Sequence, residues 1–129
     1  MSLSYIDYEG VSILLADYRQ CSDSFDQLLL LEKVAEELEK QESPIPLLVD
    51  YRGVDGSSGA QAYMKRITEL GDTVFKKHRK CAAILGITGM KKLMFNSYLK
   101  ATGSECVRCF NDKAEAFDWL VNFQEVTTV

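Results

Sequence analysis

The segment LLVDYRGVDGSSGA, residues 47–60, decides the fold because it joins three kinds of local structure. Its first residues, Leu47–Tyr51, form a short and mainly apolar run that predicts a strand. The stretch Gly53–Gly59 is rich in glycine and serine, which predicts a loop. From Ala60 to Phe75 apolar residues recur with the period of a helix. The segment is therefore predicted to be a strand, a loop and a helix start, the unit from which α/β folds are built.

The same order of strand and helix recurs on both sides of this segment. Helices are expected to begin at Ser24, after Gly86 and at Asp112, each behind a β-rich apolar run. Tyr5–Tyr8 is expected to pair beside the first run as a hairpin around Gly10. The expected strands are Val11–Tyr18, Leu47–Tyr51, Cys81–Ile87 and Glu105–Phe110. This alternation predicts one α/β domain over 1–129, with its core at about 11–120, a mainly parallel or mixed sheet of four to five strands, and about four helices.

Caps and apolar spacing predict which faces of the helices are buried. Ser24 is expected to be the N-cap of the first helix, with Gln27 completing a capping box. The inward stripe of this helix is expected to be Leu28, Leu31, Ala35 and Leu38. The helix after Gly86 is expected to turn inward Met90, Leu93, Met94 and Ser97 or Tyr98. The last helix, started by Asp112 with Glu115, is expected to bury Ala116, Phe117, Leu120 and Val121.

Composition and charge narrow the class of protein. The chain has 129 residues, of which 47% are apolar and 26% charged, as in one folded domain. Its net charge of −4 and the lack of a basic stripe predict no nucleic-acid partner. The apolar runs are too short for a membrane span, and no export signal opens the sequence, so a cytoplasmic location is expected. The sequence leaves the oligomeric state open.

The cysteines and the one histidine offer little for a metal or redox site. Cys106 and Cys109 have C-x-x-C spacing, but within a strand two such residues point to opposite faces. A zinc site would need a second pair of ligands, and His78 lies at the far end of its helix. We expect reduced core or incidental cysteines, and no metal or cofactor.

The tripeptide Asp-Tyr-Arg occurs twice, at Asp17–Arg19 and Asp50–Arg52, each time at the end of an expected strand. In an open α/β sheet, ligands and partners engage the edge formed by the carboxyl ends of the strands. The favoured interpretation is that each aspartate pairs with its arginine and caps a loop. The alternative is an acidic cluster for magnesium and phosphoryl chemistry, as in response-regulator receivers. A receiver needs an adjacent acidic pair and a closing lysine, where this chain has Asp17 alone and Cys109.

Conventional catalytic arrangements are not recognisable. A serine or cysteine nucleophile needs a nearby general base to activate it. The only histidine, His78, is expected to lie away from the functional edge, so it is not placed to act as that base. There is no G-x-x-x-x-G-K-[ST] phosphate loop, and the pair Gly86 and Gly89 alone is a weak signal. The sequence therefore predicts a protein that binds rather than catalyses.

The quoted segment resembles the STAS domain of bacterial anti-sigma factor antagonists. In that family an apolar strand ends in Asp, here Asp50, and runs to Val, an acidic residue and Ser-Ser-Gly opening a helix. The stretches Ala82–Gly86, Met90–Phe95 and Phe110–Leu120 are similar as well, the last most of all to the SpoIIAA-like or STAS/SEC14-like branch. The resemblance covers about Val11 to Leu120 and implies the same α/β fold.

What the resemblance implies for function centres on the Ser-Ser-Gly loop. In phospho-regulated members the second serine, here Ser58, is phosphorylated by a partner kinase and controls docking. A serine at a helix N-terminus can hold a phosphate on free amides. This chain departs from the family because Gly56 stands between Asp55 and Ser57, so a plain N-cap role for Ser57 or Ser58 is the favoured interpretation.

Two functions are expected on these grounds. The first is a non-enzymatic protein-interaction or regulatory module whose partner is a protein, such as a serine kinase or an anti-sigma-like factor. Its candidate docking and phosphoacceptor residues are Ser58, Ser57, Asp55, Asp50, Thr88 and Gly89. The alternative is a domain of the SEC14-like type that binds a small apolar molecule or lipid. Its candidate pocket residues are Tyr63, Met90, Met94 and Tyr98, although such spacing more often marks core.

Overall fold

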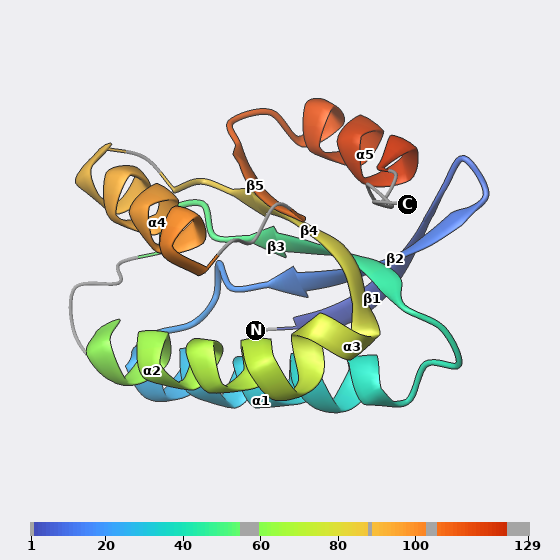
Figure 1. Ribbon diagram of the computed structural model, residues 1–129. Helices are drawn as coiled ribbons and strands as arrows, with labels where there is room; N and C mark the ends of the chain where they lie inside the picture. The colour runs from blue at the N-terminus through green and yellow to red at the C-terminus, as the bar shows by residue number, and fades with distance from the viewer. Residues whose placement is uncertain (1, 55–59, 88, 103–105, 124–129) are drawn as a thin grey trace.

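The computed structural model describes residues 2–54, 60–87, 89–102 and 106–123, in which strands alternate with helices (Figure 1). The strands are β1 (Ser2–Tyr8), β2 (Val11–Asp17), β3 (Ile45–Asp50), β4 (Arg79–Leu85) and β5 (Val107–Phe110). The helices are α1 (Ser24–Glu39), α2 (Ala60–Leu70), α3 (Lys76–His78), α4 (Gly89–Thr102) and α5 (Lys113–Asn122), and a π-helical turn, η1 (Gly71–Phe75), joins α2 to α3. Within these ranges, no helix combines the length and apolar content that crossing a membrane requires.

The five strands form one mixed sheet in the order β1-β2-β3-β4-β5. β1 is antiparallel to β2, and the other neighbours are parallel. The predicted α/β class and mixed sheet are therefore confirmed. The hairpin is longer than expected, because pairing extends from Tyr8 opposite Val11 to Ser2 opposite Asp17. Glu9 and Gly10 both have positive φ, as a tight two-residue hairpin turn requires.

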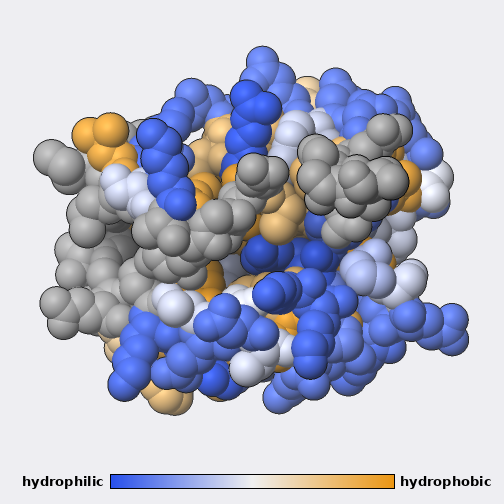
Figure 2. All heavy atoms as spheres, viewed as in Figure 1, coloured by the Kyte–Doolittle hydropathy of each residue, from blue (hydrophilic) through white to orange (hydrophobic). Residues whose placement is uncertain are grey.

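Helices cover both faces of the sheet. In the view of Figure 1, α1, α2 and α3 lie below the sheet, and α4 and α5 lie above it. In the same view, hydrophilic residues cover most of the lower surface, while apolar atoms show mainly between the layers (Figure 2). The sheet is thus the middle layer, with a separate apolar cluster on each face.

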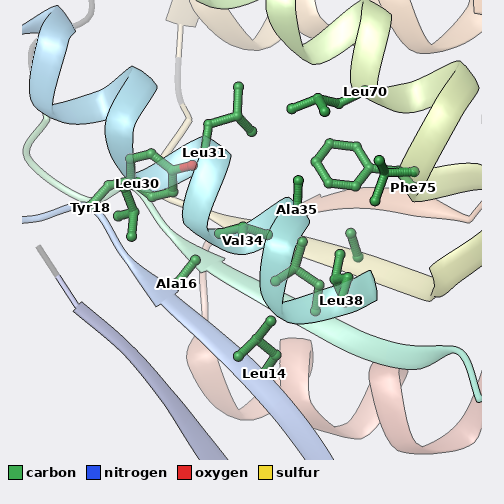
Figure 3. Packing of buried hydrophobic residues seen from close by; sticks show 13 residues of the cluster. Leu14, Ala16, Tyr18, Leu30, Leu31, Val34, Ala35, Leu38, Leu70 and Phe75 are labelled. Atoms are coloured by element: carbon green, nitrogen blue, oxygen red, sulfur yellow. The ribbon is translucent and has the colours of Figure 1, made fainter. Parts of the chain in front are cut away.

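The first cluster lies between the sheet and the helices α1 and α2 (Figure 3). Its α1 members are all at most 3% exposed: Leu30, Leu31, Val34, Ala35 and Leu38. The predicted stripe of α1 was right for three of its four residues, whereas Leu28 is only half-buried. The stripe missed Leu30 and Val34 because the helix lies flat on the sheet and buries two adjacent rows of side chains.

The predicted N-terminus of α1 was wrong by one residue. Asp23, with extended backbone, is the N-cap, and its side chain accepts a hydrogen bond from the backbone N–H of Asp26. Ser24 is the first residue of the helix. Gln27 forms no capping box, because its side chain is buried and bonds elsewhere. Aspartate and serine are both good caps, so their order in the sequence does not decide between them.

The second cluster lies between the sheet and α5. It contains Ile13, Leu48 and three residues of β4, together with Ala116, Phe117 and Leu120 of α5. Asp112 caps α5 as predicted, since its carboxylate accepts from the N–H of Ala114 at 3.2 Å. Val121 was expected inside but is only half-buried. Because Cys81 to Leu85 are all buried, β4 is covered on both faces, as its unbroken apolar sequence predicted.

The predicted inward face of α4 was wrong at Leu93, and of the alternatives Ser97 and Tyr98 the structure places Ser97 outward. Leu93 is 63% exposed and Ser97 is exposed, with its hydroxyl donating to the carbonyl of Leu93 at 3.0 Å. Neither apolar cluster includes a described residue of α4. Lys92, Asn96 and Lys100 mark one polar stripe of this helix, but apolar residues spread over more than half of its circumference, so the sequence does not single out the buried row. α4 therefore presents at least one large apolar side chain to its surroundings.

Candidate functional site

The carboxyl ends of β2, β3 and β4 lie in one row, which we call the rim. Asp17 pairs with Asp50, and Asp50 pairs with Leu85. The N–H of Tyr18 donates to the carbonyl of Asp50 at 3.0 Å, and that of Tyr51 donates to Leu85 at 2.9 Å. The segments that leave these three strands therefore start side by side, as the alternation of strands and helices predicted.

Gly86 fixes how closely two of these segments approach. Its φ of +90° is one that residues with a side chain rarely adopt. A Cβ atom placed on Gly86 would lie 2.5 Å from Cα and 2.6 Å from the backbone nitrogen of Arg52. The turn after β4 thus packs directly on the backbone that follows β3.

Asp50 is the buried charge of the rim. The residue is 1% exposed, and its two carboxylate oxygens accept from Nε and Nη2 of Arg52 at 2.9 and 2.7 Å. Its Oδ2 also lies 3.3 Å from Nε of Arg19. Burial by itself raises the pKa of Asp50, but the hydrogen bonds from Arg52 and the charges of both arginines outweigh it, so this pKa lies below its ordinary value.

Asp17 repeats the same arrangement one strand away. Nε and Nη2 of Arg19 donate to its two carboxylate oxygens at 3.0 and 2.9 Å, and the N–H of Arg19 adds a third bond at 3.0 Å. The hydrogen bonds from the Arg19 side chain are the main reason that the pKa of Asp17 is lowered. The predicted ion pairs are confirmed, and Arg19 additionally links them through Asp50. A cation bound between the two carboxylates would have to displace these guanidinium groups.

The tyrosines of the two tripeptides point the other way, into the first apolar cluster. Tyr18 is 1% exposed, and its ring centroid lies 5.4 Å from that of Tyr51. The hydroxyl of Tyr51 donates to Oε1 of the buried Gln27. Each Asp-Tyr-Arg tripeptide therefore anchors its loop inward through tyrosine and presents its arginine outward. The hydrogen bond of Gln27 and the contact of Arg19 with Asp50 were missed, although a glutamine in line with the α1 stripe was a usable signal.

Replacing Tyr51 with phenylalanine tests the inward anchor. We expect a loss of about 1 kcal/mol in the free energy of unfolding, because one hydrogen bond to a buried group is removed while the ring remains. Urea denaturation measures this. The control is Tyr8→Phe, which removes a hydroxyl that donates to the exposed Asp118 at 2.8 Å. An equal loss in both variants would contradict the special role of Tyr51.

Lowering the pH should remove the contribution that the ionised Asp50 makes to the free energy of unfolding. A carboxyl group whose pKa is lower in the folded state stabilises the fold above its unfolded pKa, near 4, and loses that contribution as the pH falls through its folded pKa. We expect Asp50→Asn to lower the free energy of unfolding by about 1.5 kcal/mol at pH 7. This lies at the low end for hydrogen bonds to a charged group, because water can hydrate both arginines once the carboxylate is gone. The two proteins should converge as the pH falls below about 4 and through the folded pKa of Asp50. Urea denaturation at each pH measures the difference, and a difference that grows as the pH falls below about 4 would contradict the role of its charge.

The other predicted site residues are placed as follows. Asp55, Ser57, Ser58 and Thr88 lie outside the described residues. Gly89 is the first residue of α4, immediately beyond the rim. The backbone of α2 includes Tyr63, and that of α4 includes Met90, Met94 and Tyr98, but the described side chains do not include these four. Asp50 is thus the candidate whose side-chain contacts are known.

Cys81, Cys106 and His78 lie apart from the rim's ion pairs, whereas Cys21 lies in the segment that leaves β2, where its N–H donates to the carbonyl of Tyr18 at 3.0 Å. Cys106 packs with the α5 cluster, and its sulfur lies 3.7 Å from Nη2 of Arg79. Burial raises the pKa of the Cys81 thiol to about 12 and is also the main cause that raises the pKa of Cys109. His78 ends α3, just before the amino end of β4, so it lies at the opposite end of that strand from the rim.

No family model matches the chain, and neither a curated protein nor a solved structure is similar enough to it to count as a match. The rim is therefore interpreted from its own residues.

Proposed function

We propose that this chain is a non-enzymatic protein-interaction or regulatory module that docks a protein partner at the rim, in the manner of the STAS domains it resembles. The observation that carries the proposal is the state of the two rim carboxylates. Asp17 and Asp50 are each held by the two-pronged guanidinium of an arginine. The carboxylate oxygens therefore hold the arginine side chains in place at the surface of the rim.

Two further features support a docking role. The segments after β3 and β4 are locked together at Gly86 and Arg52, which gives a partner a defined surface to recognise. One turn into α4, Leu93 is 63% exposed, so it offers apolar surface that a docked partner would remove from water. In this proposal the Ser57–Ser58 loop adds regulation, because a phosphate there would change the charge of the docking surface.

Site-specific photo-crosslinking in cells tests this proposal. The crosslinker is placed at Gln20 or Leu93, both exposed and close to the rim, and in the control at Glu39, at the other end of α1. We expect the same protein to be captured at Gln20 and Leu93 but not at Glu39, and Ser58→Asp to change its yield while Ser58→Ala does not. Equal capture at all three positions, or none at the two near the rim, would count against the proposal.

The alternative is a small apolar ligand held by Tyr63, Met90, Met94 and Tyr98. Native mass spectrometry after gentle purification distinguishes the two functions. A bare mass of 14.5 kDa agrees with the docking module, whereas a retained ligand favours the alternative.

A further inference from the structure

We propose that the rim binds a phosphate monoester group through Arg19 and Arg52. This inference rests on the proposed function, since it names the chemical group that a docking partner presents to the rim. It starts from the two guanidinium groups, which the fold brings together from separate loops and leaves half exposed: the side chain of Arg19 is 49% exposed and that of Arg52 is 43% exposed.

The two guanidinium groups are direct neighbours. Both contact the same oxygen, Oδ2 of Asp50, with Nε of Arg19 at 3.3 Å and Nη2 of Arg52 at 2.7 Å. The hydrogen bonds to Asp50 raise the pKa of Arg52, and the nearby positive charge of Arg19 opposes this rise. Together with Asp17 and Asp50 the pair carries no net charge, but the arginines are the half-exposed members of this cluster and the carboxylates are the more buried ones, so the surface presented to a ligand is positive.

Each arginine keeps donors to spare. A guanidinium has five N–H groups, and the carboxylates are bound through Nε and Nη2 in both cases. The hydrogen bonds of these two side chains to described residues use Nε and Nη2 and not Nη1. Because Nε and Nη2 face the carboxylates, Nη1 lies on the edge of each planar guanidinium that is turned away from them.

The buried carboxylate acts as the positioning residue of this site. Asp50 is fixed in the sheet at the end of the central strand, so it holds Arg52 in one orientation and restrains Arg19 as well. An arginine that is already held loses less freedom when it binds a ligand. This differs from an ordinary surface arginine, whose long side chain must first be ordered.

The number and spacing of donors favour phosphate over carboxylate. A carboxylate has two oxygens and is matched by a single guanidinium. A phosphate monoester has three free oxygens and a charge between −1.5 and −2 at about pH 7, so it can bridge two adjacent guanidiniums.

Titration of the isolated protein tests the inference. The Nε–Hε signals of ¹⁵N-labelled arginine are followed while phenyl phosphate is added, and acetate is added in a parallel series. We expect the signals of Arg19 and Arg52 to shift with a dissociation constant of about 1 mM, the scale for one small anionic group, and acetate to bind at least about tenfold more weakly. Absence of shifts up to about 20 mM phenyl phosphate would overturn the inference.

Lysine variants separate the fork geometry from charge. Arg19→Lys and Arg52→Lys keep the charge but lose the two-pronged donor, and each should weaken binding at least about tenfold. The matched control is Arg66→Lys, because Arg66 is similarly exposed and also binds a carboxylate, Glu32, but lies on α2 facing α1. Thermal unfolding checks that each variant is folded. A control that weakens binding as much as the rim variants would overturn the assignment.

The source of the phosphate is resolved by two further ligands. A short blocked peptide with one phosphoserine represents a partner protein, and glucose 6-phosphate represents a free metabolite. Tighter binding of the peptide supports a phosphorylated partner, and tighter binding of the sugar supports a small molecule. Crosslinking at the rim without any phosphate binding would overturn this inference and leave the docking function standing. Phosphate binding without a crosslinked partner would support the phosphate site and count against the docking function.

Discussion

Gly86→Ala should be the most damaging single substitution at the rim, with an expected loss of about 4 kcal/mol in the free energy of unfolding. Two costs combine. A φ of +90° is strained for alanine, and the new methyl group would lie 2.5 Å from Cα of Arg52. Because the obstructing atoms belong to the backbone, the clash can be relieved only by moving the segment after β3 away from the turn after β4.

Gly53→Ala is the matched control for this prediction. Gly53 also has a positive φ, +73°, and lies in the same rim segment, but nothing lies within 4 Å of its Cβ position. It should therefore show only the conformational cost, about 1 kcal/mol. Urea denaturation of the three proteins separates the two contributions. Equal losses in Gly53→Ala and Gly86→Ala would show that the close approach to Arg52 contributes nothing.

Leu30→Ala should cost about 3 kcal/mol, the second largest effect, because it opens a cavity between α1 and the sheet. Leu30 is 1% exposed in the first apolar cluster, whereas its neighbour Leu29 is 39% exposed. Leu29→Ala makes the same chemical change one residue away in the same helix, so the effects on helix propensity cancel. We expect it to cost less than about 1 kcal/mol.

The comparison of these two leucines also tests the position of α1 on the sheet. Denaturant midpoints should shift strongly for Leu30→Ala and little for Leu29→Ala, with unchanged denaturant slopes in both. If the two variants lost equal stability, α1 would have to be rotated from the orientation seen in Figure 3.

Sequence periodicity predicted the alternation of strands and helices well, because each element satisfies its own local requirements. The unbroken apolar run of β4 and the cap at Asp112 are decided within a few residues. The position of Leu93 was mispredicted because the apolar residues of α4 spread over more than half of the helix circumference. Which of those residues is buried depends on how the helix packs, and that is a tertiary property.

In the candidate site too, the local contacts could be predicted from the sequence and the contacts between strands could not. The two Asp-Tyr-Arg tripeptides are visible in the sequence, and the bond from Arg19 to Asp17 spans only two residues. The contact of Arg19 with Asp50 is different, because it exists only when β2 and β3 lie parallel in one particular register. The fit of Gly86 against Arg52 likewise joins residues that are adjacent only after β4 has paired with β3.

The antiparallel hairpin has a practical consequence for fusion proteins. Since Ser2 pairs with Asp17, the amino-terminal end of β1 lies at the rim. α5 starts beyond the carboxyl end of β5 and packs back along β4, with Leu120 contacting Cys81 near the amino end of that strand. A tag or reporter attached ahead of Ser2 would emerge beside Asp17 and Arg19 and obstruct them. One attached behind α5 leaves the arginines accessible, so immobilisation through the carboxyl-terminal side is the orientation to use in binding assays.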